Sequence, residues 1–309
     1  MRILIVGAGS IGGYFGGRLL AAGRDVTFLV RPHRAEQLAR TGLVIKSPAG
    51  DLEWPRPPIA MADNLKEPVD LILLSCKAYD VESAIDAFAP AVGPQTAILP
   101  LLNGMRHLDL LEARFGSQPV LGGQCVISVA LDPDGRILHM GELQNLSFGT
   151  RGGAVTTQAE AIAKTLSGAG FDVKLSTEIL QDMWEKWVFI ATGAGITCLM
   201  RSMIGDIVTA GANDITLALL DECGAIAARE GYAPRATTTD QARAMFTTPD
   251  STLTASMFRD IQNGARIEAD HIVGDLLRRG GEFQSPTLRI ALAHLKTYEA
   301  RRARERSRS

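Results

Sequence analysis

Short apolar runs alternate with amphipathic stretches along the first half of the chain. The apolar runs have the length and the flanking turn residues that are typical of buried strands, and the stretches between them repeat their apolar residues at helical spacing. The strand patterns lie at 3–6, 25–30, 71–74, 96–102 and 171–175, and the helical patterns lie at 11–22, 81–89, 105–115 and 157–166. This alternation predicts a largely parallel, doubly wound sheet, whose ligands bind at the carboxyl ends of the strands.

Two hairpin patterns interrupt that alternation. The segment 42–54 is centred on Ser47-Pro48-Ala49-Gly50, a sequence typical of a turn. Two longer strand patterns, 122–131 and 136–148, flank Asp132-Pro133-Asp134-Gly135, which also predicts a tight turn.

The alternation ends near Ser176, and only helical patterns follow. They lie at 178–199, 213–230, 238–246, 266–279 and 287–306. We therefore predict an α/β fold: an N-terminal Rossmann-type domain with a doubly wound parallel sheet at 1–176, and an all-α C-terminal domain at 177–309. The basic segment from Arg301 to Ser309 is interpreted as a frayed, solvated helix end.

Composition is that of an ordinary globular protein. The 309 residues suffice for two domains, and the net charge of −2 gives no electrostatic argument for binding nucleic acid or an anionic membrane. Because a strand begins at Ile3 and no apolar stretch reaches membrane-spanning length, we expect neither a signal peptide nor a membrane span, and a cytoplasmic protein. The four cysteines lack CxxC spacing and the five histidines lack metal-ligand spacing, which favours neither disulfides nor a metal site.

The segment after the first strand is rich in glycine. It reads Gly7-Ala8-Gly9-Ser10-Ile11-Gly12 and lies between a strand and a helix, the context in which a GxGxxG motif binds a dinucleotide. Gly7 permits the tight turn and Gly12 lets the helix pack close to the strand. Gly9 lets a pyrophosphate approach the helix N-terminus, where backbone N–H groups and the helix dipole favour an anion.

The end of the second strand indicates which dinucleotide binds. Enzymes that use NAD place Asp or Glu there to accept from the ribose 2′-OH, whereas this chain has Arg31 followed by Arg34. A guanidinium at Arg31 suits a 2′-phosphate, and Arg34 is a candidate second contact. The predicted cofactor is therefore NADP(H), while a solvated surface position is the alternative, stronger for Arg34 than for Arg31.

Lys77 and Asn103 each follow an apolar strand at its carboxyl end. A lysine there can meet a carboxylate or the cofactor, although a plain surface lysine is the alternative. Asn103-Gly104 is also compatible with a type I′ hairpin turn. A helical pattern at 105–115 follows instead of a returning strand, so we predict that Asn103 ends a strand-to-helix loop and faces the binding site.

Lys186 lies in a helical segment that is apolar on almost every side, so we predict that it is buried. Burial lowers the pKa of a lysine toward the range of a general acid, but an ion pair with Glu185 or a residue of another helix explains it equally well. Ser256 and Glu268, taken alone, are ordinary polar positions, and Asn263-Gly264 separates them.

These residues, in this order, resemble the ketopantoate reductase (2-dehydropantoate 2-reductase) family over almost the whole chain. The specific parts are Cys76-Lys77-Ala78, Asn103-Gly104-Met105, Trp184-Glu185-Lys186, and Ser256-Met257-Phe258-Arg259-Asp260 with Glu268. The resemblance implies that Gly7 to Gly12 hold the pyrophosphate and Arg31 the 2′-phosphate, and that Lys77 and Asn103 position the nicotinamide and the substrate. It makes Lys186 the general acid, and it assigns Ser256 to the carboxylate end of the substrate and Glu268, as a further catalytic residue, to its hydroxyl end.

One departure concerns the substrate. The family usually carries two substrate-binding asparagines four and eight residues after the catalytic lysine, where this chain has Ile190 and Ala194. Gly193 is expected to open space beside them, and Thr197 is the polar side chain further along that stripe. We expect NADPH-dependent reduction of 2-dehydropantoate to pantoate, a step of pantothenate biosynthesis.

Three alternatives stay open: a reductase or dehydrogenase of a more apolar 2-oxo or 2-hydroxy acid, an enzyme that works mainly in the oxidative direction, and an NADPH-binding sensor without catalysis. The helical half also carries enough apolar surface for a homodimer.

Overall fold

The computed structural model describes residues 1–307, and these residues form two compact units. The N-terminal unit comprises residues 1–102 and 107–179, and the C-terminal unit comprises Asn103–Arg106 and the chain from Leu180 onward. The chain therefore enters the C-terminal unit twice, the first time for only four residues.

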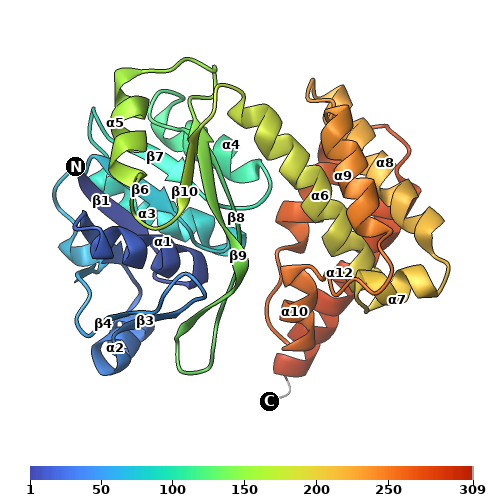
Figure 1. Cartoon of the computed structure of the whole chain (residues 1–309), viewed down its shortest axis with the longest axis horizontal. Helices are drawn as coiled ribbons and strands as arrows, with labels where there is room; N and C mark the ends of the chain where they lie inside the picture. Colours follow the sequence, from blue (N-terminus) through green and yellow to red (C-terminus); the bar gives the residue numbers. More distant parts are fainter. Residues whose placement is uncertain (308–309) are drawn as a thin grey trace. The chain divides into compact units, whose positions relative to one another are not determined.

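The first sheet of the N-terminal unit is entirely parallel. Its strands are β1 (Arg2–Val6), β2 (Asp25–Leu29), β5 (Ile59–Ala60), β6 (Leu71–Leu74) and β7 (Ala97–Pro100), in the order β5-β2-β1-β6-β7. Figure 1 labels β1, β6 and β7. Strands β6 and β7 are buried along their whole length, which explains their uninterrupted apolar sequences. This sheet confirms the predicted Rossmann-like architecture.

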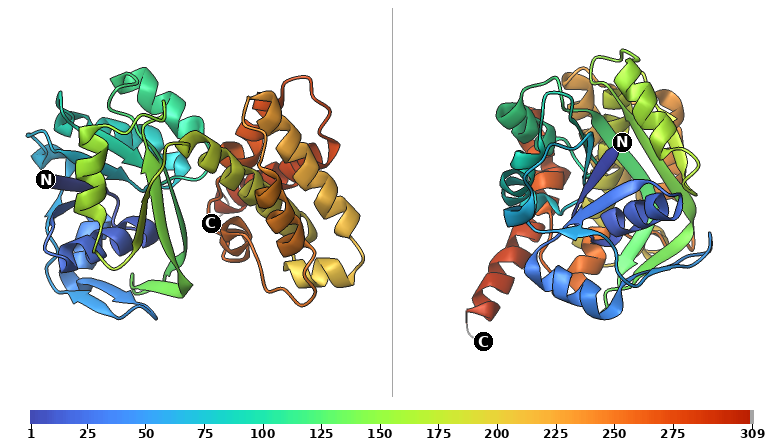
Figure 2. Two further views of the ribbon diagram at one scale, coloured as in Figure 1. Left: turned by 45° about the horizontal axis from the view of Figure 1, so that its top comes forward. Right: turned by 90° about the vertical axis from the view of Figure 1, so that its left-hand side faces the viewer.

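The strands of the two predicted hairpins lie in a second, mixed sheet, together with the strand predicted at 171–175. Its strands are β3 (Leu43–Lys46), β4 (Leu52–Trp54), β8 (Gly122–Leu131), β9 (Ile137–Gly149) and β10 (Asp172–Leu175). The order is β10-β9-β3-β4, and β8 pairs antiparallel with β9 in the long green hairpin of Figure 2. Because the turn at Asp132–Gly135 is so short, the two strands that it joins must run antiparallel.

Helix α1 (Ser10–Ala21) packs against both sheets, and its glycines make this possible. On one face Gly12 and Gly16 approach Ile5 and Phe28 of the parallel sheet; on the other, Gly13 and Gly17 approach the strands of the mixed sheet. A Cβ at Gly16 would lie 2.5 Å from the Phe28 ring. Residues 12–20 of the helix are all buried, so α1 forms the centre of the core of this unit.

The other helices of the N-terminal unit connect the strands. They are α2 (Pro32–Thr41), α3 (Val81–Phe88), α4 (Arg106–Phe115) and α5 (Thr157–Leu166), with short 3₁₀ turns at Ala62–Asn64, Ala78–Asp80 and Ala89–Ala91. The sequence analysis did not include α2, which begins at Pro32 with Arg31 at its N-cap. Asp80 precedes the first residue of α3, and its side chain makes no capping hydrogen bond there.

The C-terminal unit is helical, as predicted, and α6 (Ile179–Met200) is its longest helix. Around α6 lie α7 (Ile204–Thr209), α8 (Asn213–Arg229), α9 (Ala236–Phe246), α10 (Ser256–Gln262), α11 (Asp275–Gly280) and α12 (Pro286–Arg306) (Figure 1). Each residue of α6 is buried or half-buried. Gly195 lets α6 approach Leu219 of α8, and Gly193 lies 3.5 Å from the Phe246 ring of α9, measured from an added Cβ.

The helix predicted at 266–279 begins later and is irregular. Its first turn is a π-helix, Asp270–Gly274, which continues into α11. The segment from Gly264 to Glu268 before it is not helical, because Asn263-Gly264 ends α10 with Gly264 at φ +65°. The sequence analysis missed the short α7 and did not delimit α10.

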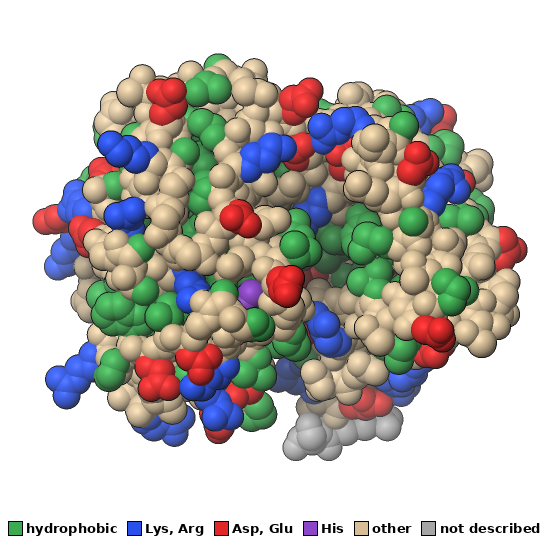
Figure 3. All heavy atoms as spheres, in the orientation of Figure 1, with side chains coloured by type: hydrophobic (Ala, Val, Ile, Leu, Met, Phe, Trp, Pro, Cys, Tyr) green, Lys and Arg blue, Asp and Glu red, His purple; other side chains and the backbone are tan. Residues whose placement is uncertain are grey.

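Two surface properties bear on function. Among the described residues, no helix is long and apolar enough to cross a membrane. On the face drawn in Figure 3, Lys and Arg side chains are interspersed with Asp and Glu, so this face carries no large patch of one charge.

Candidate functional site

The glycine-rich loop joins β1 to α1 in the geometry expected of a dinucleotide site. Gly7 has φ +96°, its N–H donates to the Leu29 carbonyl (2.9 Å), and the Ser75 hydroxyl donates to the Val6 carbonyl (3.0 Å). A Cβ at Gly12 would lie closer than 3.0 Å to the Gly7 carbonyl and to the Ser75 hydroxyl, so the fold itself requires glycine there.

Gly9 is different, because no atom of the protein lies within 4 Å of the place that its Cβ would take. Its φ of −78° is also one that any residue adopts. Gly9 is the N-cap of α1 and no side chain caps that helix, so the first turn presents its backbone to open space. A glycine that the fold does not require, at a helix N-terminus, is what close approach of a phosphate demands.

Arg31 lies at the N-cap of α2 and reaches toward α3. Its guanidinium is 3.2 Å from the Asp80 carboxylate and donates to the Ser83 hydroxyl (2.9 Å), while its side chain stays 64% exposed. Arg31 is therefore held in one orientation and is still accessible to an anion.

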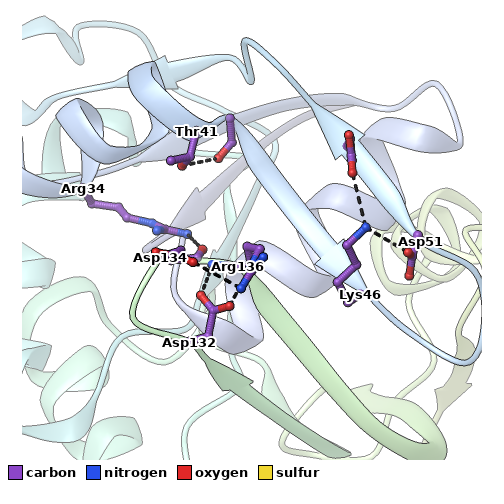
Figure 4. A network of polar contacts seen from close by, with 10 residues as sticks. Arg34, Thr41, Lys46, Asp51, Asp132, Asp134 and Arg136 are labelled. Carbon is purple, nitrogen blue, oxygen red and sulfur yellow. Dashed lines mark hydrogen bonds and ion pairs between the residues drawn. The ribbon is translucent and has the colours of Figure 1, made fainter.

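Arg34 serves the loop directly. It donates to the carbonyl of Ala8 (2.9 Å) within the glycine-rich segment, to the carbonyl of Gly135 (3.2 Å) in the β8–β9 turn, and to Gln37. Figure 4 shows Arg34 pointing toward this turn, where Asp132 and Arg136 pair at 2.6 Å. Burial lowers the pKa of Arg34 from its usual value. Its guanidinium N–H groups donate to backbone carbonyls of Ala8 and Gly135, so they are engaged within the protein.

Lys77 is exposed at the end of the β6 edge, at the N-cap of the 3₁₀ turn. It belongs to the N-terminal unit, together with the glycine-rich loop and Arg31. Asn103, Lys186, Ser256 and Glu268 all belong to the C-terminal unit.

Asn103-Gly104 is a strand-to-helix connection and not a hairpin, since α4 follows at Arg106. Gly104 has φ +78°, and a Cβ there would lie 3.0 Å from the His271 carbonyl and 3.1 Å from the His271 ring. The spacing of the histidines predicted no role for His271 and did not connect it with this segment. Its position three residues after Glu268 is the one signal that marks it.

His271 is buried in the π-helical turn next to this loop. Burial lowers the pKa of His271, and a hydrogen bond to the backbone of Asn103 opposes that shift. A hydrogen bond that raises the pKa of a histidine stabilises the protonated ring, so the ring is its donor. The His271 ring therefore donates to the backbone carbonyl of Asn103. The ring therefore fixes the backbone beside a predicted site residue.

Lys186 is half-buried, so the prediction of full burial was wrong. Two charged residues of the same helix are buried instead: the side chain of Asp182 is 8% exposed and that of Glu185 is 6% exposed. Arg235 donates to Glu185 from its backbone N–H (2.8 Å), its Nε (2.8 Å) and its terminal nitrogen (2.6 Å), and to Asp182 at 2.7 Å.

This cluster of Asp182, Glu185 and Arg235, which the sequence analysis missed, anchors α6 beside Lys186. Burial raises the pKa of Glu185, but the hydrogen bonds from Arg235 outweigh it and hold that pKa below its usual value. The same bonds raise the pKa of Arg235. The turn of α6 that carries Lys186 is thus tied to the start of α9.

Ser256 and Glu268 lie on different elements. Ser256 is exposed at the first position of α10, and Glu268 is half-buried just before the π-helical turn. The Glu268 backbone carbonyl accepts from the N–H groups of His271 (3.2 Å) and Ile272 (3.0 Å), so the turn fixes the backbone of Glu268.

Ile190 and Ala194, four and eight residues after Lys186, are apolar residues with apolar neighbours. Ile190 is half-buried and Ala194 is 2% exposed. The ring of Phe246, which stacks on Phe189 at 4.7 Å, occupies the space beside Gly193, so the expected opening is filled. The Thr197 hydroxyl donates to the Gly193 carbonyl (2.6 Å), which directs it to the backbone of its own helix.

Other chemistries find little support in the described residues. Burial raises the pKa of Cys198 and of Cys223 to about 12, so neither thiol is ionised at neutral pH. No group of three or more His, Cys, Asp or Glu side chains within residues 1–307 is arranged to hold a metal ion.

Comparisons with known proteins agree over the whole chain. The family model "Ketopantoate reductase PanE/ApbA" matches residues 3–153, and the model of the C-terminal part of the same family matches residues 178–299. The uncharacterized oxidoreductase YkpB of Bacillus subtilis is 37% identical over 97% of this chain and 99% of its own length. A 2-dehydropantoate 2-reductase of Archaeoglobus fulgidus is 28% identical over 91% of this chain and 92% of its own.

Solved structures show the same fold. A 2-dehydropantoate 2-reductase of Geobacter metallireducens superposes with a TM-score of 0.88 at 25% identity, covering 96% of this chain and 99% of that one. A D-mandelate dehydrogenase superposes equally well (0.88) at 23% identity, covering 98% of this chain and 100% of its own. The protein therefore belongs to the ketopantoate reductase family of oxidoreductases.

Proposed function

We propose that the protein reduces a small 2-oxo acid to the 2-hydroxy acid at the expense of NADPH, and that 2-dehydropantoate is the first substrate to test. The observation that carries this proposal is the grouping of Asn103 with the C-terminal unit. Asn103 follows a strand of the N-terminal unit in sequence, yet it folds with Lys186, Ser256 and Glu268. Four polar residues from distant parts of the chain thus share one compact unit.

The proposed cofactor site is the glycine-rich loop with Arg31. Gly9 leaves room for a pyrophosphate at the N-terminus of α1, and the exposed guanidinium of Arg31 supplies charge for a 2′-phosphate. D-Mandelate dehydrogenase, a relative in fold, was solved with NADH. The arginine at the end of β2 is the residue in this chain that supports NADPH instead.

A nicotinamide cofactor held by the glycine-rich loop and Arg31 would supply the hydride for the 2-oxo carbon. Lys186 holds its ammonium toward the carbonyl oxygen and gives that oxygen a proton as negative charge develops there. Lys77 and Asn103 position the reacting groups. Ser256 binds the carboxylate of the substrate, and Glu268 accepts a hydrogen bond from a hydroxyl at its other end.

Lys186 is tested by two substitutions. Lys186→Ala removes both charge and proton, and Lys186→Arg keeps the charge but holds its proton too tightly to give it up. We expect both variants to lose NADPH-dependent turnover by about 10²- to 10⁴-fold, with NADPH affinity within twofold of the parent protein. Undiminished turnover in either variant would remove Lys186 as the acid.

A second candidate substrate is an apolar 2-oxo acid, and the observation that favours it is the pair Ile190 and Ala194. Neither side chain offers a hydrogen bond, and Phe246 and Phe189 make their neighbourhood on α6 more apolar still. A site without amide partners for a substrate hydroxyl binds it more weakly than a site that has them.

The two substrates are separated by a matched pair of compounds. We would follow NADPH consumption with 2-dehydropantoate and with 3,3-dimethyl-2-oxobutanoate, which has the same skeleton without the hydroxyl. A higher kcat/KM for 2-dehydropantoate supports that assignment, and a higher value for the deoxy compound supports the apolar alternative. NADPH binding without turnover on any 2-oxo acid, in either direction, would favour a sensor.

A further inference from the structure

We propose that Asp80 sets how strongly the protein prefers NADPH over NADH, by placing a negative charge beside the arginine that reads the 2′-phosphate. This inference rests on the proposed cofactor site. It concerns a residue outside the glycine-rich loop and predicts a preference smaller than Arg31 alone would give.

The first argument is the direction of the Asp80 side chain. Asp80 is the last residue of the 3₁₀ turn Ala78–Asp80 and the N-cap of α3, which follows directly. Its side chain makes no capping bond to α3, and its Oδ2 lies 3.2 Å from Nη1 of Arg31. The carboxylate thus contacts the arginine and not the backbone of the helix.

The second argument is the way Arg31 is held. Ser83, on the first turn of α3, accepts from the other terminal nitrogen of Arg31 (2.9 Å), and its hydroxyl donates to the Asp80 carbonyl (2.9 Å). Asp80 and Ser83 therefore orient the guanidinium together. One of them carries a charge and the other does not, which lets an experiment separate charge from orientation.

The Arg31 guanidinium is accessible to an anion, and the negative charge of Asp80 beside it repels one. Arg31 is 64% exposed and Asp80 is 28% exposed, so an anion that reaches the guanidinium also meets the carboxylate. A 2′-phosphate carries a charge of about −1.5 to −2. Across roughly 6 Å of well-solvated space, one carboxylate opposes such a charge by an amount that corresponds to about a five- to tenfold change in affinity.

The test is a binding measurement that needs no turnover. We would titrate the full-length protein by calorimetry with 2′,5′-ADP and with 5′-AMP, which differ by the 2′-phosphate alone, and repeat this for Asp80→Asn and Ser83→Ala. Asn is as good an N-cap as Asp and its amide oxygen still accepts from Arg31, so Asp80→Asn removes the charge with little else changed.

We expect Asp80→Asn to raise the ratio of 2′,5′-ADP to 5′-AMP affinity about five- to tenfold, and Ser83→Ala to leave it unchanged or lower. Asp80→Ser, which also lacks the charge, should raise the ratio in the same direction if Asp80→Asn folds poorly. An unchanged ratio in the charge-removing variants overturns the inference, and so does a fall, which would make Asp80 only a support for Arg31. If the parent protein binds neither nucleotide, the proposed cofactor site fails, whereas binding with an unaltered ratio rejects the role of Asp80 alone.

Discussion

At the scale of single residues, the glycine-rich loop contains a glycine that the fold requires and another that the fold does not require. Gly12 is enclosed by the Gly7 carbonyl and the Ser75 hydroxyl, whereas Gly9 faces open space. The GxGxxG pattern alone treats these glycines alike, and only the surroundings of each one distinguish their roles.

Two alanine substitutions test this difference between Gly12 and Gly9. Gly12→Ala forces a Cβ against backbone and should lower the free energy of unfolding by about 3 kcal/mol. Gly9→Ala should leave stability within about 0.5 kcal/mol and weaken NADPH binding at least tenfold, because the added methyl occupies the space proposed for the pyrophosphate. Urea unfolding and nucleotide titration of both variants measure the two effects. Tight NADPH binding by Gly9→Ala would show that the phosphate does not come close to Gly9.

The position of a residue in the fold could be predicted where it depends on local spacing and could not be predicted where it depends on a distant partner. The strand ends at Lys77 and Asn103 were readable, because apolar runs stop abruptly there. The contact of His271 with Gly104 was not, because 167 positions of sequence separate the two residues and neither pattern refers to the other. The half-buried state of Lys186 was missed for a related reason, since an apolar helix does not reveal which of its polar residues has a buried partner.

At the scale of elements, the packing of α1 against two sheets explains why this helix contains so many glycines. Gly lowers helix stability relative to Ala by about 1 kcal/mol, yet α1 contains four within six positions, Gly12, Gly13, Gly16 and Gly17. Each lets the helix approach one of the two sheets. Close packing against both sheets offsets the poor propensity, and the sequence alone predicted the helix without predicting that it lies between two sheets.

Gly16→Ala tests that explanation. Helix propensity alone predicts stabilisation, but the new Cβ would lie 2.5 Å from the Phe28 ring and 3.0 Å from Ile5. We therefore expect a loss of about 1–3 kcal/mol of unfolding free energy in chemical denaturation. Gly23, which follows the same helix at φ +73° with open space around it, is the matched control: Gly23→Asn should cost well under 1 kcal/mol. A stabilised Gly16→Ala variant would contradict the packing argument.

The anchoring of α6 makes a second element-scale prediction. Arg235→Met leaves the buried carboxylates of Glu185 and Asp182 without their cation, so we expect a loss of about 2 kcal/mol of unfolding free energy, less than for a fully buried pair because Arg235 is 44% exposed. Arg243, on α9, forms an exposed ion pair with Asp221 of α8, and Arg243→Met, which removes that pair, should cost less than about 1 kcal/mol. Equal losses in the two variants would show that the cluster is no more than a surface pair.

At the scale of the whole molecule, stability should depend on pH through two histidines, His271, which is buried, and His294, which is half-buried. Burial lowers the pKa of His271 and of His294 from the usual 6.5, so below pH 6.5 the unfolded chain takes up protons that the folded chain refuses. The free energy of unfolding should therefore be level above about pH 7.5 and fall as the pH drops through 6.5, by at most about 1.4 kcal/mol per pH unit for each histidine. Nearer pH 4.5 the loss steepens, because protonation of Glu185 weakens its bonds to Arg235.

Urea unfolding of the parent protein, His271→Gln and His294→Gln between pH 8 and pH 5.5 measures this slope. Each variant should show a shallower fall than the parent. A slope that is unaffected in both variants would exclude the two histidines as its origin.

The overall architecture followed from the sequence more completely than the site did. Alternating strands and helices, then helices alone, are local patterns, and they predicted the parallel sheet and the helical unit. The second sheet was not foreseen because β9 pairs with strands on both of its edges, with β8 on one and with β3 and β10 on the other, and such pairing leaves no local trace. The exchange of two asparagines for Ile190 and Ala194 was visible at once, but that Phe246 fills the space beside them was not.

The excursion of Asn103–Arg106 limits how this protein can be taken apart. A gene fragment that starts at Leu180 encodes the helices but lacks those four residues, and so lacks the segment that packs on His271. Exchanging the C-terminal half with that of a relative through a single crossover would join this segment of one parent to the helices of the other. Chimeras in this family should therefore take Asn103–Arg106 and the chain from Leu180 onward from the same parent, although the two segments are far apart in the sequence.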